Sequence, residues 1–548
     1  MKFHPSTYSS LLFLCTTATA ASPASPSRPH VIFVLFDDQG YNEVNWVNGN
    51  DRRYVLPTLD SLAAEGVALE SNYYVGPICS PSRSMLMTGR YTTRLGTHAN
   101  VVYWDTPWAV PREEEFLPHV LSKHGGYTSY GVGKYHLGMM SEWALPTSRG
   151  FDKWDGYLQG CGSSWTHVAA CCHGGSPYSD QKYICKHGND NANTTKDYRG
   201  YDWFRDDKID VGANGTKVSD RMVSSAKEFL RHHAAKFDDR DEMSPVFLYL
   251  AFQNIHGPVT TEEKFYNMYK NRKDLSEDGK VLYAYLTEAD AALGEIKDEL
   301  DDLGYLDNSV IIYSSDNGAP KSQVPHRNFP LRGNKSEIWE GGTMVPGMVW
   351  TRVESLLPKE RRGSRSRELY HVTDWKPTIM RLAGIDPKVL NQSLPLDGHD
   401  IWDSIAHGSP SPREEMLYNI NPLCDRGGAR APKAAIRVGD MKLLCWCFDV
   451  AGIDGANKTG PLANPDDPPG SWPALYNLKN DPSETTNIAS DHPDIVSDLV
   501  RRLTKLADQM VVPMEWVKPF QGKDYYCADC PLHPATGPYQ PWAPWIKN

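Results

Sequence analysis

Four short apolar segments of the chain each end in side chains that can bind metal or transfer protons. These segments span residues 31–36, 130–133, 246–252 and 310–313. Short, continuous apolar runs are typical of strands that are buried on both faces of a sheet. Helix-like segments, such as residues 58–65 and 283–303, separate them. This alternation predicts an α/β domain with a large mixed, mostly parallel sheet that is sandwiched by helices.

The polar residues at the ends of these strands form the first candidate site. They are Asp37 and Asp38, Lys134 and His136, His256, and Asp316 and Asn317. Sites in parallel sheets gather outside the carboxyl ends of the strands, so we expect these distant residues to meet. Two adjacent acids alone more often cap a helix or lie in a solvated turn. Together with Asp316 and Asn317, however, Asp37 and Asp38 make an oxygen-donor set that suits Ca²⁺ or Mg²⁺.

The pattern of the chain changes at a Gly/Ser/Pro-rich segment, residues 408–412. Strand-like pieces at 435–438 and 442–445 follow it, and a helix-like segment runs from Pro493 to about Met510. We therefore predict a catalytic domain over residues 29–408 and a smaller C-terminal α+β domain over residues 413–548.

The first 20 residues resemble a secretory signal peptide. Lys2 precedes a short apolar run, and Ala18-Thr19-Ala20 suits cleavage by signal peptidase. The run is too short to span a bilayer, and no other segment is long enough, so we expect no membrane span. The prediction is a soluble protein of the secretory pathway, either secreted to the extracellular space or delivered to a lysosome or vacuole. The net charge of −11 argues against nucleic acid as a partner.

Cysteines and glycosylation sequons agree with passage through an oxidising compartment. The chain has eleven cysteines, and we expect disulfide bonds among those outside the signal peptide. Cys527-x-x-Cys530 would also suit zinc or redox chemistry, but it lacks a second pair at metal spacing. Sequons for a glycoprotein stand at Asn193, Asn214, Asn334, Asn391 and Asn457. Of these, we predict that Asn334 carries no glycan, because it lies beside a candidate site residue.

The segment from Cys79 to Arg90 carries the most specific motif. Pro81 favours a helix start here and Gly89 a helix end, which places Cys79 at a helix N-terminus, where anions are favoured. The segment resembles the sulfatase signature C-x-P-S-R-x-x-L-x-T-G-R at every fixed position. In sulfatases this cysteine is converted to Cα-formylglycine, so the resemblance implies a formylglycine-generating enzyme as a partner during maturation.

The resemblance to sulfatases extends along most of the chain. Residues 133–138 resemble the family motif G-K-W/Y-H-L-G, and similar matches include His256 and Lys335. It implies the alkaline-phosphatase-like sulfatase fold. It also implies one divalent cation, generally Ca²⁺, held by the strand-end oxygen donors and the converted cysteine, namely Asp37, Asp38, Cys79, Asp316 and Asn317.

The resemblance also implies a mechanism. One hydroxyl of the hydrated aldehyde at position 79 attacks sulfur, the alcohol leaves, and a covalent sulfoenzyme forms. His136 then deprotonates the remaining hydroxyl, and sulfate leaves. His256, helped by Lys335, protonates the leaving oxygen. Lys134, Lys335 and Arg83 stabilise the charge of the sulfate.

Within the family, the sequence looks most like the arylsulfatase B group, the N-acetylgalactosamine 4-sulfatases. The implied substrate is therefore an aryl sulfate or a sulfated carbohydrate. A Cys-rich stretch, residues 161–201, looks like an insertion relative to that group and could reshape the rim of the pocket. Three alternatives remain: a formylglycine-dependent phosphodiesterase or phosphonate hydrolase, an inactive relative that binds sulfated glycans, and a structural extracellular protein.

Overall fold

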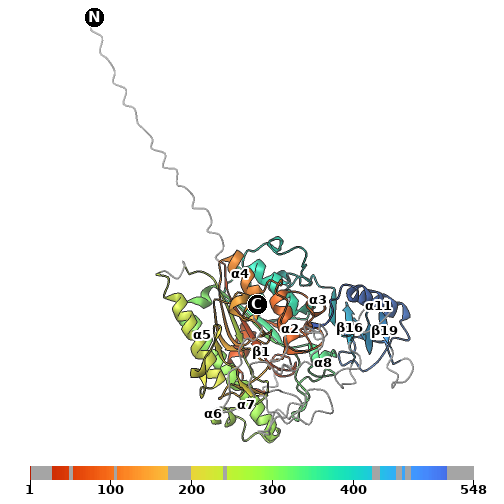
Figure 1. The fold of residues 1–548 in the computed structure, drawn as a ribbon, viewed down its shortest axis with the longest axis horizontal. Helices are drawn as coiled ribbons and strands as arrows, with labels where there is room; N and C mark the ends of the chain where they lie inside the picture. The colour runs from red at the N-terminus through yellow and green to blue at the C-terminus, as the bar shows by residue number, and fades with distance from the viewer. Residues whose placement is uncertain are drawn as a thin grey trace.

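A mixed sheet of ten strands dominates the part of the chain that the computed structural model describes (Figure 1). The described residues are Met1, 28–47, 53–103, 108–170, 199–238, 243–422, 432–451, 459–462 and 471–514. In spatial order the strands are β13 (Ser364–Ser366), β2 (Val67–Leu69), β12 (Gly347–Trp350), β11 (Ser309–Ser315), β1 (His30–Phe36), β10 (Val246–Ala251), β4 (Thr128–Lys134), β5 (Lys153–Tyr157), β8 (Phe204–Arg205) and β9 (Lys208–Ile209). The five strands from β11 to β5 run parallel to one another. Antiparallel pairs lie on either side of them, which confirms the predicted sheet.

The central strand β1 shows why the strands of this sheet are apolar throughout. Its side chains alternate between the two faces. Val31, Phe33 and Leu35 belong to one core cluster, whereas Ile32, Val34 and Phe36 belong to another. Helices α2 (Cys79–Thr88), α4 (Leu117–Gly125) and α9 (Trp375–Leu382) are among those that contribute to the first cluster. Helices α1 (Pro57–Glu65), α5 (Val218–Ala234) and α7 (Glu277–Asp302) are among those that contribute to the second cluster. Helices therefore cover both faces, as predicted.

The helices differ from their predicted bounds mainly where capping decides the start. Helix α7 begins at Glu277, six residues before the predicted start at 283. Its first turn is polar and carries no apolar periodicity. The Ser276 side chain accepts a hydrogen bond from the Gly279 backbone N–H, which fixes the earlier start. Helix α2 ends as predicted, because Gly89 takes the left-handed conformation with φ of 70°.

A smaller antiparallel sheet forms the C-terminal part of the structure. Its strands are β15 (Glu415–Ile420), β16 (Ala434–Val438), β17 (Met441–Cys445) and β20 (Ala474–Asn477), in that order. Helix α11 (Pro493–Ala507) lies beside them (Figure 1). The other face of the sheet packs Met416, Tyr418 and Leu444 in one cluster with Tyr74 and Trp339 of the larger part. The smaller second sheet is thus confirmed, and the domain boundary near residue 410 stays a prediction.

The remaining strands and α-helices of the described residues are short. They are β3 (Tyr73–Tyr74), β6 (Val168–Ala170), β7 (Arg199–Tyr201), β14 (Tyr370–His371), β18 (Cys447–Asp449), β19 (Gly460–Leu462), α3 (Thr92–Leu95), α6 (Glu263–Tyr266), α8 (Glu340–Thr343) and α10 (Trp402–His407). Among the described helices, none has the length and apolar character needed to cross a membrane. Cys447 is disulfide-bonded, whereas Cys79 and Cys445 are buried thiols.

Several predictions from the sequence fall outside the described residues. They concern the signal peptide, most of the Cys-rich stretch, the pair Cys527 and Cys530, and the sequons at Asn193 and Asn457.

Candidate active site

The pairing of β1 with β11 brings two of the predicted strand ends together. Phe36 lies opposite Ser315 in this parallel pair, so Asp37 and Asp316 follow adjacent strand ends. The Asp38 backbone N–H donates to Asp316 Oδ1 at 3.3 Å, and Asn317 Nδ2 donates to Asp38 Oδ1 at 2.7 Å. The four predicted oxygen-donor residues therefore form one buried cluster.

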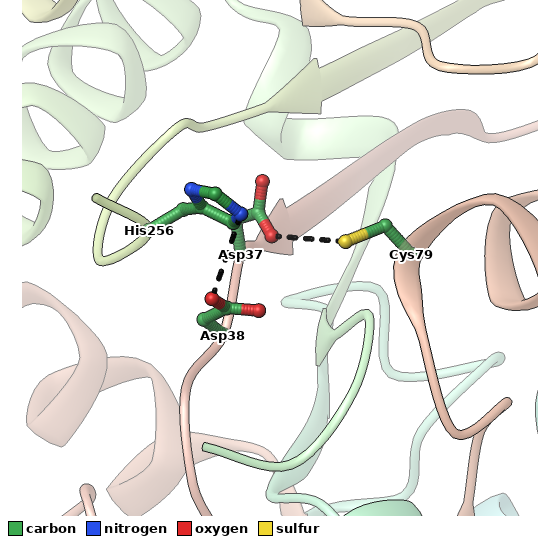
Figure 2. A group of neighbouring side chains, drawn as sticks. All are labelled: Asp37, Asp38, Cys79 and His256. Atoms are coloured by element: carbon green, nitrogen blue, oxygen red, sulfur yellow. Dashed lines mark hydrogen bonds and ion pairs between the residues drawn. The ribbon is translucent and has the colours of Figure 1, made fainter. Parts of the chain in front are cut away.

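On the other side of β1, strands β10 and β4 contribute cationic and imidazole side chains. The Asp37 backbone N–H donates to Asn254 O at 2.8 Å, which ties the segment after β10 to the acidic cluster. His256 Nε2 lies 3.7 Å from Asp38 Oδ2 (Figure 2). Lys134, the last residue of β4, lies with its Nζ 2.5 Å from Asp37 Oδ2. The carboxyl ends of four neighbouring strands thus meet at one site, as expected for a parallel sheet.

Helix α2 places Cys79 and Arg83 against the same cluster. Cys79 Sγ lies 3.7 Å from Asp37 Oδ1, and Figure 2 shows this side chain directed at Asp37 from across the site. The Arg83 guanidinium donates to Asp316 Oδ2 through Nε at 3.0 Å and Nη2 at 2.8 Å. Arg83 Nη1 donates to the Lys134 backbone carbonyl at 3.0 Å. Arg83 therefore directs its donors at protein groups that build the site.

Lys335 comes from a loop outside the sheet. Its Nζ lies 2.5 Å from Asp38 Oδ1. The Lys335 backbone N–H donates to Ala319 O at 3.0 Å, which holds the loop beside the segment after β11. The structure thus brings Lys335 to the cluster from a position that no strand pattern indicates.

The pKa values of the acids reflect burial opposed by these cations. Burial alone raises the pKa of Asp37, but Lys134 and His256 more than offset it and hold the pKa below its ordinary value. Burial likewise raises the pKa of Asp38, but Lys335 and His256 hold it below its ordinary value. The pKa of Asp316 is raised, first by burial and then by the neighbouring Asp37 charge. The surrounding cations therefore keep Asp37 and Asp38 ionised, whereas the charged form is disfavoured at Asp316.

The oxygen donors fit a divalent cation. Asn317 Oδ1 is buried and has no hydrogen-bond partner among the described residues, so a carbonyl oxygen is left without a donor inside an acidic cluster. One ligand atom each from Asp37, Asp38, Cys79 and His256 also lies within 4.8 Å of the others. Carboxylate and amide oxygens are the ligands that Ca²⁺ or Mg²⁺ prefers. His256, predicted as a proton donor, lies beside the predicted oxygen donors.

Cys79 and His136 are both kept neutral in this environment. Burial raises the pKa of the Cys79 thiol to about 12, although Lys134 and Lys335 oppose it. Burial, and then the positive charge of Lys134, holds the pKa of His136 well below its ordinary value. A neutral, buried thiol is a poor nucleophile, because the thiolate is the reactive form.

Some residues that support the site were not predicted from the sequence. Arg327 Nη2 donates to the Asp38 carbonyl at 2.8 Å, and the same guanidinium forms a buried ion pair with Glu43. Tyr249 lies with its hydroxyl 3.4 Å from Arg83 Nη1. Arg327 lies in a loop and Glu43 in a turn segment, so neither has a periodicity that would identify it as buried.

Comparisons with known proteins bear on what such a site does. A family model described as Sulfatase matches residues 29–385. Arylsulfatase J from Mus musculus is 32% identical over 547 residues, which cover 95% of this chain and 81% of that protein. N-acetylgalactosamine-6-sulfatase from Mus musculus is 28% identical over 507 residues, covering 88% and 86%. Among solved structures, the crystal structure of Ps i-CgsB matches with a TM-score of 0.69 at 24% identity over 89% of this chain and 94% of that chain, which bears on the fold alone.

Proposed function

The chain belongs to the sulfatase family and is a sulfuric ester hydrolase, and on that premise we propose that it removes sulfate from a sulfated sugar after Cys79 has been converted to formylglycine. The observation that carries the proposal is the arrangement of Lys134, Lys335 and the acidic cluster around Cys79. In this buried site, the position of the proposed nucleophile lies beside cations that can bind a sulfate group.

The chemical state of Cys79 supports the proposed conversion. As a thiol with a pKa of about 12, Cys79 does not supply a nucleophile near neutral pH. The hydrated aldehyde of formylglycine supplies a hydroxyl nucleophile at this position. Cys79 begins helix α2, whose N-terminal N–H groups favour an anionic ligand beside it.

Two lysines are proposed to bind the sulfate group. Lys134 and Lys335 are each paired with a carboxylate, which keeps both ammonium groups charged and oriented inside the protein. Arg83 is proposed to act on sulfate indirectly, because its donors hold Asp316 and the Lys134 carbonyl. Asp37, Asp38, Asp316 and Asn317 would hold the divalent cation, which offsets the charge of the ester when it is bound.

The two histidines are proposed to move protons. His256 Nδ1 lies 2.6 Å from the Gly257 carbonyl, so Nδ1 carries a proton, and Nε2 lies toward Asp38. Against the effects of burial and of Lys335, the charges of Asp38 and Asp37 raise the pKa of His256. His256 is therefore proposed to carry a second proton on Nε2 and to donate it to the leaving oxygen. His136 is buried and neutral, so its imidazole can accept a proton in the second half of the turnover.

We propose an N-acetylgalactosamine sulfate as the substrate, with the 4-sulfate as the first candidate. The resemblance to the arylsulfatase B group supports the 4-sulfate, whereas a relative at 28% identity is named for the 6-sulfate. We also propose that the protein is exported through the secretory pathway, on the basis of residues 1–20 and of the maturation that Cys79 needs.

The test compares the wild-type protein with Cys79→Ser, both made in a host that contains formylglycine-generating enzyme. The wild-type protein should hydrolyse 4-nitrocatechol sulfate at least 100 times faster than bis(4-nitrophenyl) phosphate or a phenylphosphonate ester. Cys79→Ser should fold normally and lose turnover, because serine is not a substrate for the conversion. Faster turnover of the phosphorus esters would favour the phosphodiesterase alternative. Binding of sulfated sugars without turnover by the converted protein would favour the inactive relative.

A panel of sugars then tests the substrate. N-acetylgalactosamine 4-sulfate should have a higher kcat/KM than the 6-sulfate, with release of free sulfate as the readout. A preference for the 6-sulfate, or for neither sugar, would overturn the substrate proposal and leave the reaction type standing.

A further inference from the structure

We propose that Gly160 is a positioning residue for His136: the absence of a side chain at position 160 lets the imidazole ring occupy its working place. A Cβ atom at Gly160 would lie 2.9 Å from His136 Cε1 and 3.2 Å from Nε2. Real Cβ atoms essentially never approach another heavy atom to 2.9 Å. The ring therefore packs against the bare backbone at this position. The inference rests on the proposed function for the role of His136 in turnover.

The segment that carries Gly160 is held rigidly by a buried carboxylate. Asp202 accepts the Leu158 backbone N–H at 3.0 Å and the Gln159 backbone N–H at 2.8 Å, one with each carboxylate oxygen. Asp202 is only 2% exposed, so these two hydrogen bonds compete with little water. The backbone just before Gly160 is thus fixed to the segment that follows β7.

Two further hydrogen bonds join this segment to the stretches of chain after β4 and β10 that carry His136 and His256. The His136 backbone N–H donates to Leu158 O at 3.1 Å. Gln253, three residues before His256, donates through Nε2 to Gly162 O at 2.8 Å. The wall formed by residues 158–162 is therefore anchored on both sides of Gly160, and it cannot move away from an added methyl group without breaking these bonds.

The imidazole ring of His136, in contrast, is held by packing. His136 Nδ1 is buried and has no hydrogen-bond partner among the described residues. The atoms that the new methyl group would meet are at the far end of the side chain, which can rotate. A side chain at position 160 should therefore displace the ring while the fold stays intact.

Such a displacement should slow the reaction without weakening substrate binding. A misplacement of about 1 Å at a reacting group can lower the rate by about 100-fold. We expect Gly160→Ala to lower kcat at least tenfold and to lower KM in parallel, so that kcat/KM changes by less than about threefold, because only the second step is slowed and the atoms nearest the new Cβ belong to His136. His136 is proposed to act after the alcohol has left, so the first turnover should release a burst of alcohol product before a slow steady state.

Gly162→Ala is the matched control in the same wall. Its Cβ would lie 3.7 Å from the nearest neighbouring atom, Val168 O, which is ordinary contact. Neither glycine has a backbone φ in the left-handed region, so alanine is allowed at both. We expect Gly162→Ala to retain wild-type kcat, KM and burst behaviour. The formylglycine content of every variant is measured by mass spectrometry, so that turnover is compared per converted site.

A second readout does not depend on turnover. Crystal structures of Cys79→Ala and of the double variant Cys79→Ala with Gly160→Ala are compared. The His136 ring should be rotated away from residue 160 in the double variant only, and the two proteins should unfold within about 2 °C of each other. An unmoved ring, equal kcat for the two glycine variants, or a large loss of stability in Gly160→Ala would each overturn the inference. If the wild-type protein hydrolyses no sulfate ester, the proposed function fails, while the crystal structures still decide whether Gly160 positions His136.

Discussion

Arg83 and Asp316, 233 residues apart in the sequence, form a fully buried ion pair that joins helix α2, which begins at Cys79, to the segment after β11 that carries the proposed metal ligands. Two nitrogens of the guanidinium donate to the same carboxylate oxygen, at 2.8 and 3.0 Å. Neither side chain is exposed to solvent. The signature motif thus contributes more than the cysteine, because its arginine fixes where Cys79 lies relative to the acidic cluster.

Removal of the arginine charge should therefore destabilise the protein strongly. Arg83→Met leaves Asp316 buried beside Asp37 without its cation, and loss of one partner of a buried pair costs about 3–5 kcal/mol of unfolding free energy. Arg381 provides the control, since it pairs with Asp400 and Asp403 at the surface and its side chain is 43% exposed. Arg381→Met should cost less than about 1 kcal/mol. Urea denaturation measures both, and equal losses would contradict the structural role assigned to Arg83.

Chelation of the divalent cation should lower both activity and stability. Asp37, Asp38 and Asp316 lie close together, and a bound cation stabilises only the folded arrangement. We expect a chelator to abolish turnover and lower the unfolding temperature, and excess Ca²⁺ to restore both. Asn317→Ala should weaken Ca²⁺ affinity by at least about tenfold. A chelated protein that contains no metal by elemental analysis and retains full activity would rule out this assignment.

Lys442 of the smaller sheet should influence the active site from a distance. Its Nζ lies 2.9 Å from Glu340 Oε1 and 2.7 Å from Glu484 Oε1, and all three side chains are buried. Glu340 begins α8, and within α8 the Gly342 carbonyl accepts from the backbone N–H of Gly318, the residue after Asn317. The smaller sheet is therefore linked to the metal-binding segment by a short chain of contacts.

Lys442→Met should destabilise the protein by about 3–5 kcal/mol, because it leaves two buried carboxylates without their cation. It should also weaken Ca²⁺ binding. The double variant Lys442→Met with Glu484→Gln removes one of the two charges and should recover part of the loss. Calorimetry with added Ca²⁺ measures both effects, and unchanged Ca²⁺ affinity in the single variant would show that the smaller sheet does not support the site.

His30 should make the fold sensitive to acid. Its Nδ1 accepts the Val246 backbone N–H at 3.0 Å, so it must be unprotonated, and burial lowers its pKa from 6.5 to about 3. The unfolded chain therefore binds a proton that the folded chain does not between pH 6.5 and 3. By linkage, the contribution of His30 is lost as the pH falls through this window, with a limit of roughly 5 kcal/mol.

The measurement is the unfolding free energy of the wild-type protein and of His30→Gln, between pH 7.5 and 4. Glutamine does not titrate, and its side-chain oxygen can accept the same N–H. The wild-type curve should fall more steeply with acid than the variant curve. Parallel curves would mean that His30 does not titrate on unfolding.

The sequence alone predicted the position of those site residues that directly follow an apolar strand. The acids after β1 and β11, and His256 after β10, follow apolar runs, and parallel pairing necessarily brings such ends together. Lys335 was identified only through its family motif, because it lies in a loop that is placed by tertiary contacts.

The supporting residues could not be predicted in the same way. Charged residues are expected at the surface from a single sequence. Three of them are nevertheless buried beside partners that are distant in the chain, namely Arg327, Asp202 and Lys442. Gly160 gives no signal in the sequence, because its role depends on the ring of His136, which reaches it only after β4 and β5 have paired.

The mass of the peptide that contains Cys79, in protein from its native host, shows whether this cysteine is converted to the proposed nucleophile. Conversion to formylglycine replaces the sulfur with oxygen and removes two hydrogens. We expect to find this mass in the active protein, in proportion to its specific activity towards sulfate esters. An active protein whose peptide carries only unmodified cysteine would contradict the proposed nucleophile and the function built on it.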